Sequence, residues 1–120
     1  TTLNVVLNYT GRWDIIQATK KITEQVVNGD ISVADINEEM LARNLATADL
    51  LEPDLFIRTS GEKRISNFFL WQLAYTELYF TNTAWPDFTV QDFAGALASF
   101  NNRERRFGKT SAQLIGDENV

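Results

Sequence analysis

The stretch from residue 53 to residue 86 most constrains the fold, because it places an apolar run directly before a short polar turn. Residues 54–57 (Asp-Leu-Phe-Ile) follow Pro53, a pattern typical of a strand inside a sheet. The run ends at Arg58, and residues 59–61 (Thr-Ser-Gly) form a polar turn after it. Open α/β sheets bind ligands beyond the carboxyl ends of their strands, so this polar turn is the first candidate site.

Arginines and a candidate helix start surround the polar turn. Arg64 follows it, and Ser66 and Asn67 are residue types that favour the N-terminus of a helix, where phosphate is attracted. Guanidinium groups bind phosphate oxygens through several hydrogen bonds. Arg58, Arg64 and Ser66 therefore predict a phosphate-binding site. The alternatives are solvated surface arginines and a plain helix cap at Ser66 and Asn67.

Glu77 is the single carboxylate in the aromatic and aliphatic run over residues 68–80. A charge in such a run is costly unless it is paired or bound to a metal. We therefore expect Glu77 either to bind Mg²⁺ near the phosphate site or to form an ion pair with one of the arginines. One carboxylate alone does not complete a magnesium site, which also takes substrate phosphates and waters.

The residues before Pro53 predict a strand followed by helices. Residues 3–7 (Leu-Asn-Val-Val-Leu) predict a short strand covered on both faces, as in parallel sheets. Residues 8–14 predict a turn that leads into a helix, with Trp13 in the core. Apolar spacing predicts this helix from Asp14 to about Asn28.

Further elements complete an alternating pattern. Ser32 and Asn37 mark two helix starts before the strand at residues 54–57, and this order suits a right-handed crossover between parallel strands. Residues 78–80 predict a third strand. Thr89 and Asp92 resemble a capping box at the start of a closing helix.

The end of the chain is polar. The closing helix carries a basic cluster at residues 103–106, which we expect on solvated surface, and Gly108 is a natural terminator. Residues 109–120 show no pattern and predict a flexible tail.

Composition excludes several function classes. The chain has no cysteine and no histidine, which removes thiolate chemistry and the commonest general base and zinc ligand. Its net charge of −5 argues against nucleic acid as the main partner. No apolar stretch is long enough for a membrane span and no signal peptide is visible, so the cytoplasm is the expected compartment.

Two features predict that the chain is part of a larger protein. It starts at Thr1, and its single methionine is Met40. Three short strands also make a poor complete sheet, because both edges need cover. We therefore expect further strands from elsewhere.

The motifs carry a family resemblance. IRTSGEKRISNFFLWQLAYTELYF, then WPDF and NRERRFG, resemble the C-terminal half of the cis-prenyltransferases, in particular their bacterial undecaprenyl diphosphate synthase branch. NYTGRWDI is similar to the region upstream, so the resemblance covers nearly all of residues 3–108.

This resemblance implies an α/β fold, with residues 1–108 forming part of a mostly parallel central sheet flanked by helices. It implies a homodimeric, Mg²⁺-dependent transferase that adds isopentenyl diphosphate units in cis to an allylic diphosphate such as farnesyl diphosphate. The product would be undecaprenyl diphosphate, a membrane lipid and the precursor of the cell-wall lipid carrier.

The resemblance also implies residue roles. Arg58 resembles the first arginine that binds isopentenyl diphosphate, and Arg64 and Ser66 resemble its other contacts, with the Ile65 backbone between them. Glu77 is similar to the magnesium ligand of the family. Lys63 stands where relatives often have histidine or glutamine, which leaves that position without an assigned role.

One departure from the family pattern concerns catalysis. The aspartate of the DGNGRW-type motif is absent, so no catalytic residue is expected in this chain and the chain alone is expected to be inactive. A non-catalytic subunit that dimerises or binds diphosphate is the alternative function. A nucleotide-phosphate binder is a weaker alternative, since no P-loop signature is present.

Overall fold

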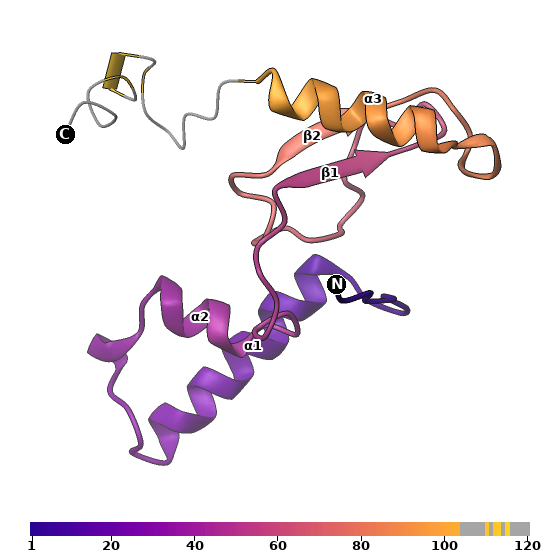
Figure 1. The fold of residues 1–120 in the computed structure, drawn as a ribbon. Helices are drawn as coiled ribbons and strands as arrows, with labels where there is room; N and C mark the ends of the chain where they lie inside the picture. Colours follow the sequence, from indigo (N-terminus) through magenta and orange to yellow (C-terminus); the bar gives the residue numbers. More distant parts are fainter. Residues whose placement is uncertain (104–109, 111, 114, 116–120) are drawn as a thin grey trace. The chain divides into compact units, whose positions relative to one another are not determined.

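A computed structural model describes residues 1–103, 110, 112, 113 and 115. Its elements are α1 (Gly11–Val27), η1 (Val33–Asp35), α2 (Glu38–Asn44), β1 (Leu55–Arg58), β2 (Glu77–Phe80), η2 (Trp85–Asp87) and α3 (Val90–Asn101), where η denotes a 3-10 helix (Figure 1). The chain divides into two compact units. The helical unit comprises residues 1–53 and 64–76, and the strand unit comprises residues 54–63 together with the described residues from Glu77 onwards.

Helix α1 has a defined cap at each end. Thr10 is extended, and its Oγ1 accepts a hydrogen bond of 3.2 Å from the Trp13 amide. Asn28 is the C-cap, and Gly29 follows with φ of 80°, a left-handed value that glycine adopts without strain. The predicted end is confirmed, but the helix begins at Gly11 and not at Asp14.

The core of the helical unit is small. Helices α1 and α2 pack against each other. The buried apolar side chains are Ala18 and Ile22 of α1 together with Leu45 and Leu73, each at most 9% exposed. Trp13 is 51% exposed, so its predicted place in the core is wrong.

The short helices begin where their caps predict. Ser32 and Asp35 form a capping box at the start of η1. The Oδ1 atom of Asn37 accepts a hydrogen bond of 2.9 Å from the Met40 amide at the start of α2. Both predicted helix starts are confirmed.

The predicted strand over residues 3–7 is wrong. These residues form neither helix nor strand, and Leu3, Val5 and Leu7 are 86%, 74% and 81% exposed. A strand needs a neighbour that pairs with its backbone groups. Within the described residues β1 and β2 pair with each other and with no third strand, so the crossover expected from residues 3–7 does not form either.

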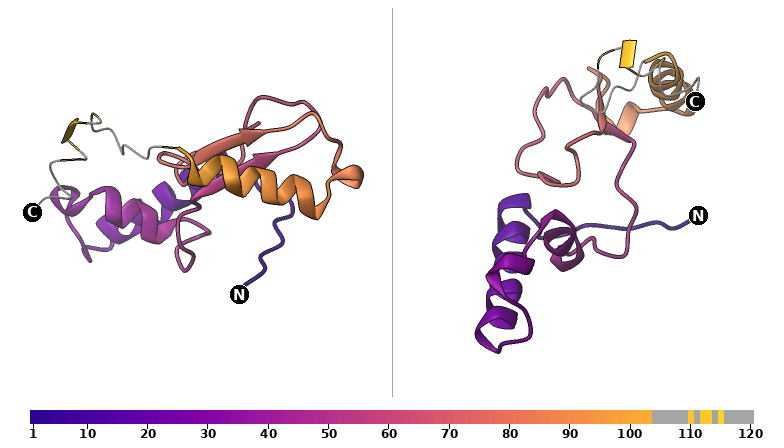
Figure 2. Two further views of the ribbon diagram at one scale, coloured as in Figure 1. Left: turned by 45° about the horizontal axis from the view of Figure 1, so that its top comes forward. Right: turned by 90° about the vertical axis from the view of Figure 1, so that its left-hand side faces the viewer.

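The strand unit contains a parallel pair. Leu55 of β1 pairs with Glu77 of β2, and Arg58 pairs with Phe80. The two predicted strands are confirmed, with bounds that differ by one residue. Helix α3, in the same unit, lies alongside the strand pair and runs in the direction opposite to the two strands, as Figures 1 and 2 show.

Helix α3 begins at the predicted capping box. The Thr89 amide donates a hydrogen bond of 2.7 Å to Oδ2 of Asp92, while Thr89 Oγ1 accepts one from the Asp92 amide. Ala96 is fully buried. The helix ends at Asn101; the predicted terminator Gly108 and most of the predicted tail lie outside the described residues.

No helix begins at Ser66 and Asn67, which corrects the prediction made for them. Their φ angles are 48° and 59°, in the left-handed region, where a right-handed helix cannot start. Residues 66–75 form turns and a bend, so the connection between the parallel strands contains no helix.

Candidate functional site

Arg58 occupies the position that the sequence predicts for it, at the carboxyl end of a strand. It is the last residue of β1 and is half-buried, and its carbonyl accepts a hydrogen bond of 3.0 Å from the Thr81 amide. The guanidinium therefore starts from a fixed strand end, the place where α/β sheets present ligand-binding groups.

Two amide groups of the polar turn already donate hydrogen bonds within the protein. Ser60 donates to the carbonyl of Thr83 at 2.8 Å, and Gly61 donates to the carbonyl of Thr81 at 2.9 Å. Both turn residues have positive φ, 65° for Ser60 and 73° for Gly61. The turn is thus locked onto residues 81–83, and any anion bound here depends on side chains more than on these two amides.

Glu77 lies at the other end of the strand pair from Arg58. Its amide donates to the Asp54 carbonyl at 3.0 Å, and its position in the pair is opposite Leu55, whereas Arg58 is opposite Phe80. Four paired residues separate the two ends by about 10 Å along the strands. Within the strand unit, the Glu77 backbone therefore lies at the opposite end of the pair from Arg58.

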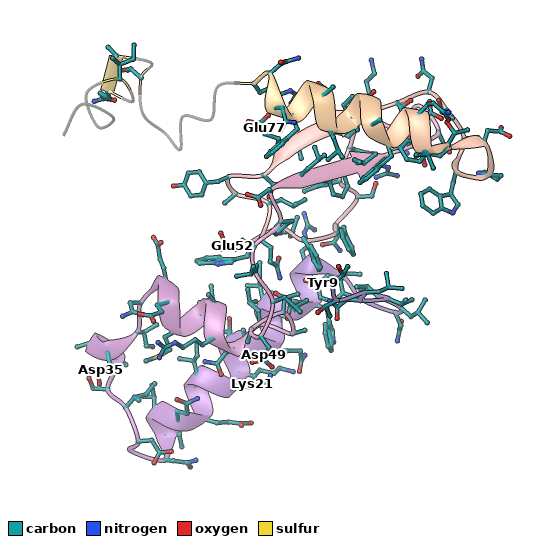
Figure 3. All side chains as sticks on the ribbon, viewed as in Figure 1. Tyr9, Lys21, Asp35, Asp49, Glu52 and Glu77 are labelled. Carbon is teal, nitrogen blue, oxygen red and sulfur yellow. The ribbon has the colours of Figure 1, made fainter. Side chains whose placement is uncertain are left out.

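The Glu77 carboxylate forms an ion pair. Arg103 Nη1 donates a hydrogen bond of 2.8 Å to Glu77 Oε2 and one of 3.0 Å to the Leu78 carbonyl. Figure 3 shows Glu77 where β2 starts, beside the C-terminal end of α3. Glu77 therefore forms an ion pair, but its partner is Arg103 and not one of the two arginines considered from the sequence. Arg103 is thus not the purely solvated arginine that we expected; Arg105 and Arg106 lie outside the described residues.

The other predicted substrate-binding residues belong to the helical unit. Arg64 and Ser66 are exposed, and Ile65 between them is half-buried, with its carbonyl accepting a hydrogen bond of 3.1 Å from the Phe68 amide. Arg58 and Glu77 belong instead to the strand unit.

Sequence reasoning missed a buried polar network in the helical unit. Asp14 is 2% exposed, and its carboxylate accepts hydrogen bonds from the Tyr9 hydroxyl at 2.6 Å and the Ala46 amide at 2.8 Å. Gln72, 5% exposed, donates to Asp14 Oδ2 at 3.3 Å and to Thr47 Oγ1 at 2.8 Å. Burial, reinforced by the hydrogen bond to Asp14, raises the pKa of Tyr9 to about 12.

One signal in the sequence could have pointed to this network. Gln72 is an amide inside an otherwise apolar run, and a buried amide needs hydrogen-bond partners. Identifying Asp14 as its partner requires the tertiary structure, because the two residues are far apart in the chain.

The Glu77 carboxylate can supply one ligand of a magnesium ion. A carboxylate oxygen is the kind of ligand that Mg²⁺ prefers, and Mg²⁺ commonly takes only one or two carboxylates beside phosphates and waters. In the part of the chain that the structure describes, no three or more acidic residues, histidines or cysteines gather into a metal site. The remaining ligands would have to come from phosphate oxygens, water and other residues.

None of the helices among the described residues combines the length and the apolar character that a bilayer span needs.

Comparisons with known proteins agree with the motifs. The family model described as "Putative undecaprenyl diphosphate synthase" matches residues 1–108. A ditrans,polycis-undecaprenyl-diphosphate synthase ((2E,6E)-farnesyl-diphosphate specific) of Legionella pneumophila (strain Paris) is 60% identical over 109 residues, which are 91% of this chain and 46% of the relative. The protein with the same description from Escherichia coli (strain K12) is 55% identical over 117 residues, 98% of this chain and 45% of the relative.

A solved structure shares the fold. The crystal structure of lavandulyl diphosphate synthase from Lavandula x intermedia, in complex with dimethylallyl diphosphate, matches with a TM-score of 0.83 and 46% identity over 86% of this chain and 44% of that chain. The parallel strand pair and its helices are thus an incomplete α/β fold of the prenyltransferase class, as expected from the sequence.

The particular family follows from the match over residues 1–108. The chain belongs to the undecaprenyl diphosphate synthase family of cis-prenyltransferases. It spans about half the length of the curated relatives that it matches. Its assignment to the C-terminal half of the fold, and the tail over residues 109–120, stay predictions.

Proposed function

We propose that this chain is part of a transferase that adds isopentenyl units in cis to an allylic diphosphate, farnesyl diphosphate, to give undecaprenyl diphosphate. The observation that supports this most is the identity of 55–60% to synthases of that description, over nearly the whole chain. Within this function the chain would supply the isopentenyl diphosphate site.

The chemistry proceeds by attack of a double bond on an allylic carbon. The terminal double bond of isopentenyl diphosphate forms a bond to C1 of the allylic partner, and the C1–oxygen bond breaks. Diphosphate leaves with that electron pair, and C2 of the former isopentenyl unit loses a proton to give the new cis double bond. Such a reaction needs alignment of two substrates and stabilisation of the departing charge, and it needs no histidine.

The proposed contribution of this chain is to hold the nucleophilic substrate. Arg58 at the end of β1 would bind the diphosphate of isopentenyl diphosphate, together with Arg64, Ser66 and the Ile65 backbone. The strand end and the locked polar turn give Arg58 a rigid base, which supports a positioning role. None of these residues is proposed to transfer the proton.

Glu77 is the proposed magnesium ligand. The ion would stabilise negative charge on the departing diphosphate when bound. The alternative role of Glu77 is structural: its Oε2 atom lies 2.8 Å from Arg103 Nη1, and without a metal ion this ion pair would be its only role. A homodimer and a cytoplasmic location with peripheral contact at the membrane remain part of the proposal.

Incorporation of radiolabelled isopentenyl diphosphate tests the function. The assay compares this chain alone with a chimera, in which the chain replaces the matching segment of one of its synthase relatives. We expect an active, Mg²⁺-dependent chimera and an inactive chain. A chimera that folds and dimerises but incorporates no label would reject the proposed activity.

The alternative is a non-catalytic subunit that dimerises or binds diphosphate. Its basis is that the described residues contain no group of three or more acidic side chains that could hold a metal ion. Binding of isopentenyl diphosphate by the chain, measured by calorimetry, combined with an inactive chimera would support this alternative.

A further inference from the structure

The segment that carries Arg64 and Ser66 is held in an unusual backbone conformation. Ser66 and Asn67 are consecutive left-handed residues, with φ of 48° and 59°. Non-glycine residues rarely adopt this region, and asparagine tolerates it better than most. Such a conformation persists only where the surroundings stabilise it.

Those surroundings are the first turn of α1. The Gly11 amide donates to the Asn67 carbonyl at 2.6 Å, and the Arg12 amide donates to Asn67 Oδ1 at 3.0 Å. One residue far away in the chain thus provides acceptors for two amides that have no partner within the helix. Thr10 provides the acceptors for the next two amides of the described turn: its Oγ1 accepts from the Trp13 amide and its carbonyl accepts from the Asp14 amide.

The residues that follow Asn67 pack so closely against the start of α1 that no side chain fits at Gly11. A Cβ atom on Gly11 would lie 2.6 Å from Leu70 Cγ and 2.7 Å from the Phe68 carbonyl oxygen. The backbone that follows Asn67 therefore lies directly against the start of α1. Asn67 is the side chain that joins the two by hydrogen bonds, and Ser66 and Arg64 are its immediate neighbours in the chain.

We propose that Asn67 is a positioning residue for the binding of the isopentenyl diphosphate group by Arg64 and Ser66. This inference rests on the proposed function of those two residues. The Asn67 side chain and carbonyl hold the left-handed backbone against α1, and this fixes the direction in which Ser66 and Arg64 leave the chain. The first two amides of α1 donate to Asn67 in these bonds, so they are not available to bind a ligand.

Three substitutions of Asn67 separate its contributions in the chimera. Asn67→Asp keeps an oxygen acceptor and tolerance of the left-handed region. Asn67→Gly keeps the backbone freedom and loses the acceptor, and Asn67→Ala loses both. Thr10→Ala is the matched control, because it removes a cap bond from the same helix end without touching the segment.

The readout is the KM for isopentenyl diphosphate against the KM for the allylic diphosphate. Displacement of a positioned group costs about 10- to 100-fold, so we expect Asn67→Ala to raise the first KM by about that factor and the second by less than about twofold. Asn67→Gly should show an intermediate increase, and Asn67→Asp should stay close to the parent. Thr10→Ala should lower the thermal midpoint without changing either KM.

Other outcomes would reject either the role of Asn67 or the proposed substrate site. If Asn67→Ala and Thr10→Ala raise both KM values equally, or change stability alone, Asn67 is only a helix cap and the inference fails. If Asn67→Ala does not fold, Asn67→Gly decides, since an unchanged KM in that variant rejects the inference. If Ser66→Ala and Arg64→Ala leave the KM for isopentenyl diphosphate unchanged, the proposed substrate site fails instead.

Discussion

Arg103 holds Glu77 through its Nη1 atom, which lies 2.8 Å from Glu77 Oε2 and 3.0 Å from the Leu78 carbonyl oxygen. The pair joins the residue just beyond α3 to the first residues of β2. The side chains of Arg103 and Glu77 are 40% and 23% exposed, so solvent screens the pair. Within the described residues Glu77 Oε1 accepts no hydrogen bond, which leaves one oxygen of the carboxylate for a cation.

Substitution at the two members of this pair separates the metal role from the structural role. Glu77→Gln removes the charge, and Arg103→Ala removes the ion pair while it keeps the carboxylate. Because partly exposed pairs contribute about 0.2–1 kcal/mol, both chimeras should remain folded. If Glu77 binds magnesium, only Glu77→Gln should lose Mg²⁺-dependent turnover, by about 100-fold, since a lost ligand weakens charge stabilisation by several kcal/mol.

The measurement is turnover as a function of Mg²⁺ concentration, with circular dichroism as the control for folding. Equal losses in both variants, or unfolding of the Glu77 variant, would show that the pair is structural and would remove Glu77 from the metal site.

Arg58→Ala should affect one substrate more than the other. A charge-assisted hydrogen bond contributes about 1.5–3 kcal/mol, so the KM for isopentenyl diphosphate should rise roughly 10- to 100-fold in the chimera. The KM for the allylic diphosphate should change by much less. Steady-state kinetics with each substrate varied in turn provides the test, and Lys63→Ala, at an exposed residue on the same connection, is the control. Equal changes for both substrates would reject the assignment of Arg58.

Local patterns in the sequence predicted the elements that depend on local chemistry. The capping box at Thr89 and Asp92 and the cap at Asn37 are complete within four residues, so they could be identified without a fold. The apolar runs that form β1 and β2 were equally clear. These features needed no information about distant partners.

Elements that depend on distant partners were mispredicted. Asn67 was expected to cap its own helix, yet it caps α1, whose first residues lie more than fifty positions earlier in the chain. Residues 3–7 have the composition of a strand but no neighbour among the described strands. The Arg103–Glu77 pair likewise joins residues 26 positions apart, which only the fold brings together.

Asp14→Ala should strongly destabilise the protein. It would leave the Tyr9 hydroxyl, the Ala46 amide and one bond of the buried Gln72 without the buried acceptor that they share. Unsatisfied buried groups cost about 1–3 kcal/mol each, and partial rearrangement reduces their sum, so we expect a loss of roughly 3 kcal/mol. Urea unfolding of the chimera measures it. Asp30→Ala, at an exposed aspartate, should change stability by less than about 0.5 kcal/mol, and a similar loss there would contradict the prediction.

Tyr9 should make stability depend on pH in the alkaline range. Its pKa is raised from 10.0 to about 12 in the folded state, chiefly by burial and then by the hydrogen bond to Asp14. Between these values the folded state binds more protons than the unfolded state, so stability falls as the pH rises. The contribution is complete below about pH 10 and is lost as the pH passes 12.

Tyr9→Phe isolates this contribution. The urea midpoint of the parent should fall more steeply between pH 10 and 12 than that of Tyr9→Phe, because the variant has no phenol at this site. Tyr75→Phe, at a side chain that is 58% exposed, should follow the parent. Parallel curves for the parent and Tyr9→Phe would show that Tyr9 keeps its ordinary titration.

Two glycine substitutions should change the stability of the protein in opposite directions. In Gly11→Ala the new methyl would lie 2.6 Å from Leu70 Cγ and 2.7 Å from the Phe68 carbonyl oxygen, and backbone cannot move aside as a flexible side chain can. Overpacking of this kind costs about 1–3 kcal/mol. Gly95→Ala places its methyl on α3 with nothing within 4 Å, and it should stabilise the protein by about 0.5–1 kcal/mol through a better helix propensity. Thermal unfolding of both chimeras measures the difference. If Gly11→Ala is as stable as the parent, the segment after Asn67 does not lie against α1 as described, and the positioning role of Asn67 loses its structural basis.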